Sequence, residues 1–248
     1  MVFYGSTDVG KMRSGNEDNF RICNIQNGAV LAVVCDGMGG AAGGSTASTL
    51  AVETFCSIIL QNEKLLFTPE GELKENTVKN ALLTAVNKAN NAVYQKSVMD
   101  SSLVGMGTTL VACFAYRDRV IGVNVGDSRM YAVYGDTAKR ISKDHSYVQM
   151  LVDNGEITEE QAQSHPKKNI IMRAVGVDDN VAADVFVLNA DMDRILLCSD
   201  GLTNYLADDE IPSFFKKDTQ SNVKALIDYA NSCGGNDNIT VAVIDFCE

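Results

Sequence analysis

One stretch near the N-terminus constrains the fold more than any other part of the chain. Residues 29–35 are seven apolar residues, mostly small or β-branched, and the Asp36 that follows them precedes three glycines within four positions. Such a run predicts a buried β-strand. The strand fixes the acid, and the glycines allow backbone or a ligand to approach it closely. Taken alone, the pattern is equally typical of an ordinary turn.

The same construction recurs further along the chain. Asp200 ends a predicted apolar strand over 194–199 and precedes a glycine, as Asp36 does. Asp127 lies between two predicted strands, and Asp237 directly precedes the last predicted strand with two glycines just upstream. Four acids at strand ends in one chain favour convergence on a single point, where they would form a site.

Composition limits the class of protein. The chain has 248 residues, of which 46% are hydrophobic, and no Pro-rich or Gly/Ser-rich linker, so we expect one domain over 1–248. Its net charge of -11 argues against nucleic acid or an anionic membrane as a partner. Acidic surface residues explain most of that charge, and cation-binding carboxylates would add to it.

Location and redox state follow from two further features. No apolar run is long enough to span a membrane, and the N-terminus lacks the pattern of a signal peptide, so we expect a cytoplasmic protein. Most of the seven cysteines, an odd number, lie within apolar runs and are interpreted as core residues of a reducing compartment. These are Cys35, Cys113, Cys198 and Cys247.

Periodicity predicts an α+β fold, because strands come in runs with helices segregated between them. Strands are expected over 29–35, 108–116, 120–125, 130–134, 194–199 and 239–246. Helices are expected over 45–60 with Ser45 as N-cap, 76–97, 146–153, from Thr158 with a Thr158/Gln161 capping box, 208–216 and 221–232.

The chemistry of clustered aspartates points to hard cations. Carboxylates that share a site repel one another unless a cation offsets them, and Mg²⁺ or Mn²⁺ prefers oxygen ligands. The chain has two histidines and no paired cysteines, which excludes a soft or imidazole-based site. Two such cations bridged by one carboxylate would acidify a bridging water to hydroxide and hold a phosphoryl group for in-line attack. Arg13 is the candidate to hold the phosphate oxygens.

Six segments, in order, resemble the successive motifs of the metal-dependent protein phosphatase 2C family, and the match is strongest with its small single-domain bacterial branch. They span 13–18, 36–40, 105–109, 126–129, 199–201 and 235–240, and the resemblance covers essentially the whole chain. It implies a four-layer α-β-β-α sandwich of two antiparallel sheets flanked by helices. It also implies hydrolysis of phosphoserine and phosphothreonine in proteins.

The resemblance assigns a role to each candidate site residue. By position, Asp36 would bridge two cations, Mn²⁺ or Mg²⁺, and the Gly37 carbonyl would bind the first. Asp200 and Asp237 would hold the second, with Glu17 nearby through water, while Asp127 and Asp200 would hold a third, weaker cation. Arg13 would bind the substrate phosphate.

The resemblance further implies a flap and partners. Residues 144–173 correspond to a mobile flap that touches substrate. Phosphorylated proteins are the implied substrates, with a cognate serine/threonine kinase as the opposing enzyme, and a monomer is the default state. His145 and His165 are available as acids for the leaving alkoxide, although a lone histidine in a polar segment is usually solvated.

Two other functions stay open from the residues alone. A catalytically inactive relative could act as a binding or regulatory module, but every acid that the cations would need is present. The same site could also hydrolyse a small phosphorylated molecule or an aspartyl phosphate. Cysteine-based phosphatases and nucleotide kinases are excluded, because neither a Cys-x₅-Arg loop nor a Walker-type loop occurs.

Overall fold

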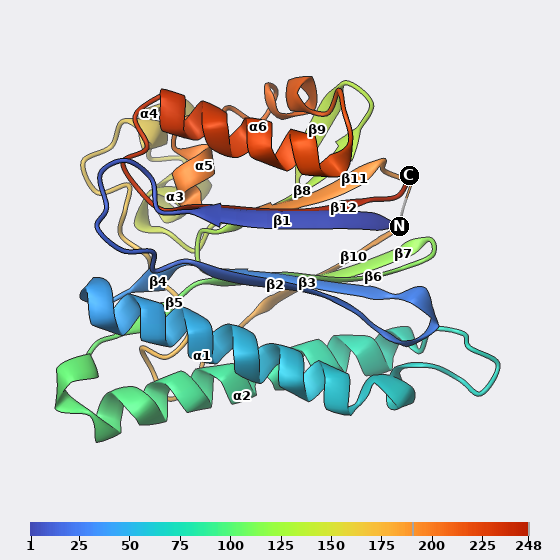
Figure 1. Ribbon diagram of the computed structural model, residues 1–248. Helices are drawn as coiled ribbons and strands as arrows, with labels where there is room; N and C mark the ends of the chain where they lie inside the picture. The colour runs from blue at the N-terminus through green and yellow to red at the C-terminus, as the bar shows by residue number, and fades with distance from the viewer. Residues whose placement is uncertain (190, 248) are drawn as a thin grey trace.

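The protein is a sandwich of four layers, with two sheets inside and helices on both outer faces (Figure 1). The computed structural model describes residues 1–189 and 191–247, apart from the side chain of Ala41. One five-stranded sheet has the order β1-β12-β11-β8-β9, and the other has the order β10-β7-β6-β3-β2. Every strand pair in both sheets is antiparallel, so the expected α+β sandwich is confirmed.

The strands of the two sheets come from all parts of the chain. The first sheet contains β1 (Val2–Asp8), β8 (Arg129–Tyr134), β9 (Thr137–Arg140), β11 (Arg194–Cys198) and β12 (Ile239–Asp245). The second contains β2 (Asn19–Asn24), β3 (Val30–Cys35), β6 (Leu110–Tyr116), β7 (Arg119–Val125) and β10 (Asp184–Asn189). A small third sheet pairs β4 (Gly37–Met38) with β5 (Gly107–Thr108).

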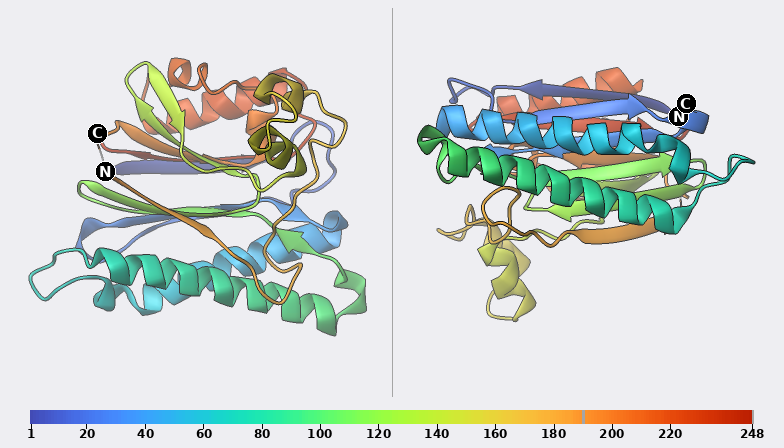
Figure 2. Two further views of the ribbon diagram at one scale, coloured as in Figure 1. Left: turned by 180° about the vertical axis from the view of Figure 1, so that it is seen from behind. Right: turned by 90° about the horizontal axis from the view of Figure 1, so that it is seen from below.

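Helices cover the outer faces unequally. Two long helices lie on the second sheet, α1 (Gly40–Gln61) and α2 (Glu75–Met99). The first sheet is covered by α5 (Asp200–Thr203) and α6 (Thr219–Ser232). Two short helices, α3 (Tyr147–Asp153) and α4 (Glu159–Gln163), form an excursion at one end of the sandwich (Figure 2). Short 3₁₀ turns complete the chain at Gln26–Gly28, Glu63–Leu66, Ser101–Leu103 and Ile211–Phe214.

The position of strand β3 explains why its sequence is apolar at every residue. Its side chains alternate between two buried layers, because successive residues of a strand point to opposite faces. Leu31 and Val33 face the helices α1 and α2, whereas Ala32 and Val34 face the other sheet. A third apolar layer fills the space between the first sheet and α6. A central strand buried on both faces needs apolar residues at every position.

The predicted helix starts at Ser146 and Thr158 are confirmed. The capping box is present, since the backbone N–H of Gln161 donates to the Thr158 hydroxyl over 3.2 Å and the Thr158 N–H donates to the Gln161 side chain over 2.8 Å. Ser146 caps α3 with a single bond, in which its hydroxyl accepts the Gln149 N–H over 3.2 Å. In the described part of the chain, no helix is both long and apolar enough to cross a membrane.

Other expectations about local structure are wrong. Helix α1 begins at Gly40 and not after Ser45, because Gly39 takes a left-handed conformation and starts the helix without a side-chain cap. The helix expected over 208–216 is only a 3₁₀ turn, Ile211–Phe214, with Pro212 near its start. Strands β1, β2, β9 and β10 are absent from the prediction, and all four lie at sheet edges where polar residues interrupt the apolar pattern.

The cysteines divide into two groups. All seven are free thiols, as the sequence predicts. Cys35, Cys113 and Cys198 are buried core residues, but Cys247 is exposed just beyond β12, which corrects its assignment to the core.

Candidate metal centre and active site

The strand ends that carry the four aspartates lie at the end of the sandwich opposite the marked termini (Figure 1). Asp36 follows β3 in one sheet, and Asp200 follows β11 in the other and begins α5. Asp127 lies in the turn between β7 and β8, and Asp237 precedes β12. The site is therefore assembled between the ends of both sheets.

Threonines fix the backbone of Asp36. The Thr109 hydroxyl accepts the Asp36 N–H over 2.8 Å, and the Asp36 carbonyl accepts bonds from the Thr108 hydroxyl over 2.8 Å and the Thr109 N–H over 2.9 Å. The Thr109 hydroxyl also bonds the Ser128 hydroxyl over 2.7 Å, in the turn that carries Asp127. The two acidic turns of this half of the site are thus held in one hydrogen-bonded unit.

Gly37 has no room for a side chain. A Cβ atom at this position would overlap the carbonyl oxygen of Gly44 and lie 2.6 Å from the carbonyl oxygen of Glu17. The absence of a Cβ thus lets the Glu17 loop and the first turn of α1 close around the Asp36 turn. The Glu17 carbonyl therefore lies beside the Asp36–Gly37 turn.

Asn238 organises the opposite half of the site. This buried side chain donates to the carbonyls of Val9 over 2.9 Å and Gly15 over 3.0 Å, and its oxygen accepts the Glu17 N–H over 2.8 Å. Its own N–H donates to the Asp237 carboxylate over 2.9 Å. The long loop between β1 and β2 is thereby tied to Asp237, a role that the sequence analysis did not foresee.

Asp18 is a second site residue that the sequence analysis did not assign. The Ser199 hydroxyl donates to one of its carboxylate oxygens over 2.7 Å, while the other oxygen is buried without a hydrogen-bond partner. Burial raises the pKa of Asp18 to about 7, and the hydroxyls of Thr240 and Ser199 partly oppose that rise. In the sequence it stands next to Glu17 within the 13–18 segment, and two adjacent acids there are also typical of a solvated charged loop.

The predicted acids lie close enough to raise one another's pKa values. Burial raises the pKa of Asp36 well above its ordinary value, and repulsion by the carboxylates of Asp18, Asp200, Asp127 and Asp237 raises it further. Like charges this close favour protons or a cation at the site.

The pKa values of Asp127 and Asp200 are raised by the same burial and repulsion. Burial raises the pKa of Asp127 to about 8, with Asp200 as the next cause. Burial and then Asp237 raise the pKa of Asp200, while hydrogen bonding from Asn204 and Asp36 opposes the shift. One carboxylate oxygen of Asp200 is buried and unpaired. A bound cation would satisfy that oxygen.

The donor set fits hard cations held in part by water. In the described ranges, no three His, Cys, Asp or Glu side chains are placed to hold an ion by themselves. Mg²⁺ usually keeps several waters and takes only one or two carboxylates from the protein. Asp18 and Asp200 each have a buried carboxylate oxygen without a hydrogen-bond partner, and the pKa of each carboxyl group is raised. Both features fit a cation-binding site, because a bound cation would contact the unpaired oxygens and offset the repulsion between the acids.

Arg13 lies at the rim of this cluster. Its guanidinium donates to the Asp237 carboxylate over 2.8 Å, and its side chain is half exposed. That hydrogen bond is the main reason why the pKa of Arg13 is raised, and the negative charges of Glu17 and Asp36 add to it. The predicted phosphate-binding arginine therefore faces the site and solvent together.

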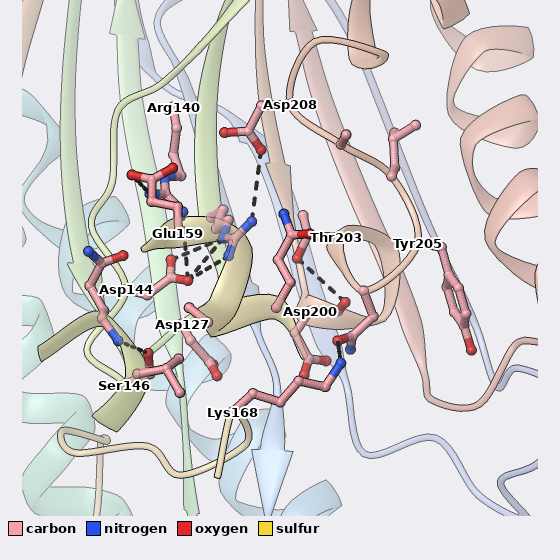
Figure 3. A pocket seen from close by; sticks show the side chains of 18 of the residues that line it. Asp127, Arg140, Asp144, Ser146, Glu159, Lys168, Asp200, Thr203, Tyr205 and Asp208 are labelled. Atoms are coloured by element: carbon pink, nitrogen blue, oxygen red, sulfur yellow. Dashed lines mark hydrogen bonds and ion pairs between the residues drawn. The ribbon is translucent and has the colours of Figure 1, made fainter. Parts of the chain in front are cut away.

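A cavity of about 550 Å³ adjoins the acids on the side of α3 and α4. Figure 3 shows Asp127, Asp200 and Lys168 in its wall. The Lys168 ammonium donates to the Asn204 side chain over 3.2 Å, so the segment after α4 contacts the loop after α5. At the base of the excursion, Asp144 forms a two-pronged ion pair with Arg129, at 2.7 to 3.1 Å.

The two histidines differ in their surroundings, because His145 has hydrogen-bond partners in the site and His165 lies nearer the surface. His145 is not solvated as the sequence analysis expected, because its Nδ1 accepts the Gly126 N–H over 3.0 Å and its Nε2 lies 3.2 Å from the Asp184 carboxylate. Arg173 also contacts Nε2 at 3.0 Å. Burial lowers the pKa of His145. His165 is only partly buried and lies beside the Tyr147 ring.

The fold and the site together define a class: an α-β-β-α sandwich protein with a cluster of buried carboxylates between the ends of its sheets. A family model described as protein phosphatase 2C matches residues 11–238. The chain therefore belongs to the protein phosphatase 2C family and is a protein phosphatase.

Several bacterial phosphatases are similar to nearly the whole of this chain. The serine/threonine phosphatase stp of Listeria welshimeri is 40% identical over 242 residues, which are 96% of this chain and 93% of that protein. The protein phosphatase PstP of Mycobacterium tuberculosis is 36% identical over 96% of this chain and 44% of its own length. The crystal structure of Stp1 from Staphylococcus aureus superposes with a TM-score of 0.89 at 32% identity, covering 98% of this chain and 94% of that one.

Proposed function

We propose that this protein hydrolyses phosphoserine and phosphothreonine in proteins with two bound Mn²⁺ or Mg²⁺ ions. The observation that carries the proposal is the meeting of Asp36, Asp200 and Asp237 between the sheets, with Arg13 at their rim. The serine/threonine phosphatases among the similar proteins support the choice of substrate class.

Each acid has a proposed place around the cations. Asp36 would bridge both ions, the Gly37 carbonyl would bind the first, and Asp200 with Asp237 would hold the second. Glu17 would act through water, and Asp127 with Asp200 would hold a third, weaker ion. When bound, the ions would supply an activated water and charge neutralisation at the phosphoryl group.

The residues of the chain orient the substrate. Arg13 would bind two phosphate oxygens through its guanidinium, which suits bidentate recognition better than an ammonium does. Its bond to Asp237 would then aim the phosphate at the cluster of acids. We further propose that residues 144–173 form the flap beside the cavity, that 1–248 act as one catalytic domain, and that a cytoplasmic serine/threonine kinase supplies the phosphoproteins.

The test is hydrolysis of a phosphothreonine peptide and of p-nitrophenyl phosphate with added Mn²⁺, added Mg²⁺ or a chelator. We expect turnover of the peptide that needs the metal and that the chelator abolishes. Turnover of the small ester alone would favour a non-protein substrate. Turnover of neither compound, with metal shown to bind, would support a binding module instead.

A further inference from the structure

Two cysteines from different elements lie close together outside the proposed site. Cys23 is on β2 and partly exposed, whereas Cys56 is on α1 and fully buried. Each thiol lies close enough to shift the pKa of the other. Cys23 also packs against the apolar cluster that contains Cys56.

The way in which β2 is aligned along α1 independently supports the proximity of the two cysteines. The Asn19 side chain donates to the Thr49 hydroxyl over 3.0 Å, which aligns the start of β2 with α1 (Figure 1). Cys23 lies four residues after Asn19 on the same face of the strand, about 13 Å along it. Cys56 lies seven residues after Thr49 on the same face of the helix, about 10.5 Å along it. The two cysteines therefore face each other one step further along the same interface.

The surroundings make the two thiols chemically different. The Cys56 thiol lowers the pKa of Cys23 to about 7, burial opposes this shift, and the nearby Arg21 guanidinium favours the thiolate. The Cys23 thiol and burial raise the pKa of Cys56. Cys23 is thus the nucleophile at neutral pH, and Cys56 stays protonated beside it.

We propose that Cys23 and Cys56 form a peroxide-sensitive thiol pair that closes a reversible disulfide between β2 and α1. The Cys23 thiolate attacks one oxygen of hydrogen peroxide, the O–O bond breaks, and the leaving hydroxide takes a proton to become water. Cys23 is then a sulfenic acid. The Cys56 sulfur attacks the Cys23 sulfur, the S–S bond forms, and the S–O bond breaks with loss of water that carries the Cys56 proton. The two sulfurs lose two electrons in total, and peroxide is reduced to two waters.

The order of the two steps follows from exposure. Peroxide can reach the partly exposed Cys23, but the side chain of Cys56 is enclosed in the core between α1 and the sheet. Sequence proximity alone would not suggest this pair, because 33 residues separate the two positions. The modification does not depend on the proposed function, since its product is read from the covalent state of the protein.

The experiment maps disulfides after treatment of the full chain with hydrogen peroxide at pH 7.5 and blocking of the remaining thiols with N-ethylmaleimide. No Lys or Arg lies between Arg21 and Lys64, so trypsin leaves both cysteines in one peptide, and a second cleavage after Glu53 separates them. We expect a Cys23–Cys56 cross-linked peptide that dithiothreitol releases. Its formation should be at least about tenfold faster than oxidation of the exposed Cys233, because the thiolate is the reactive form.

Variants separate the two steps. Cys56→Ser should leave a sulfenic acid on Cys23 that dimedone traps, and Cys23→Ser should protect Cys56 from peroxide altogether. Cys233→Ser is the matched control and should leave the cross-link unchanged. Absence of the cross-link in the natural chain, at peroxide levels that oxidise Cys233, would overturn the proposal, as would a Cys23–Cys35 disulfide in its place. Mapping the natural chain gives this answer even if a variant does not fold.

Discussion

The two Asp-Gly turns share one dipeptide but continue in different ways. Gly37 begins the short strand β4, which comes before α1, whereas Asp200 and Gly201 themselves start helix α5. A Cβ at Gly37 would overlap the Gly44 carbonyl of α1, and a Cβ at Gly201 would overlap the Asn238 carbonyl beside β12. The glycine thus serves the same purpose in both turns, to let a neighbouring backbone close on the acid.

The difference shows what each turn contributes. The Asp36 turn belongs to one sheet and is fastened by the Thr108 and Thr109 hydroxyls, and the second of these also bonds Ser128 in the turn before β8. The Asp200 turn belongs to the other sheet and keeps a buried carboxylate oxygen without a partner. Hydroxyl groups fix the backbone of the Asp36 turn, whereas the Asp200 turn holds a buried carboxylate oxygen that makes no hydrogen bond. The following predictions test that contrast, from the largest effect to the smallest.

Asp200→Asn should lower turnover of a phosphothreonine peptide by about a thousandfold or more, because a carboxylate ligand to a catalytic cation is worth several kcal/mol. The variant should still fold, since removing one negative charge relieves repulsion in the cluster. Steady-state kinetics and circular dichroism measure the two effects. Asp228→Asn, at an exposed site on α6, is the control and should keep full activity. Substantial activity of Asp200→Asn with metal bound would refute the role assigned to this residue.

Gly201→Ala should lower the free energy of unfolding by about 3 kcal/mol, because the added Cβ forces apart two backbones that cannot easily shift. Gly37→Ala should cost about 2 kcal/mol, since the first turn of α1 can give way more easily. Urea denaturation measures both variants. Gly15→Ala is the control, because a Cβ there meets no atom within 4 Å. Equal stability of Gly201→Ala and the control would contradict the close approach at Asn238.

Removing the metal should destabilise the protein most at high pH. The pKa values of Asp18 and Asp127, about 7 and about 8, lie above the usual value near 4, so the metal-free fold binds more protons than the unfolded chain between about pH 4 and pH 8. Its stability therefore falls as the pH rises through that window. Cations at a hundred times their Kd should restore about 2.7 kcal/mol.

Thermal unfolding with Mn²⁺ and with chelator, at pH 5 and pH 8, measures this effect. The gain in Tm on adding metal should be larger at pH 8, because fewer protons then compete with the cation. An equal gain at both values would show that these carboxylates do not bind the metal.

Arg13→Ala should raise KM for a phosphopeptide about tenfold with a smaller change in kcat, because a half-exposed guanidinium contributes more to binding than to the reaction itself. Arg13→Lys should recover only part of that loss, since an ammonium lacks the two-pronged geometry. If kcat falls more than KM rises, Arg13 acts mainly in the transition state.

The predictable part of the fold is the part buried on both faces. β3, β6 and β11 could be predicted because central strands need apolar residues throughout. β1 and β2 could not, because they lie at sheet edges and carry polar residues such as Ser6 and Arg21. The start of α1 was missed because a left-handed glycine replaces the usual side-chain cap.

The residues of the candidate site also divide into those that could be predicted from the sequence and those that could not. Acids that follow apolar strands or glycines stand out in the sequence, as Asp36 and Asp200 do. The supporting residues Asp18 and Asn238 do not stand out, because their importance depends on contacts with segments about 200 residues away. Long-range hydrogen bonds of this kind leave no local pattern.

The pairing of the first and last strands has a practical consequence. Val2 lies opposite Asp245 in the antiparallel ladder, so the two ends of the chain lie next to each other on the side of the sandwich away from the acids (Figure 1). A short peptide could join these ends, and the chain could be reopened at the exposed β6–β7 turn around Arg117. A circularly permuted protein of this kind could be anchored to a solid support by its new ends, so that the end of the sandwich with the four aspartates points toward the solution.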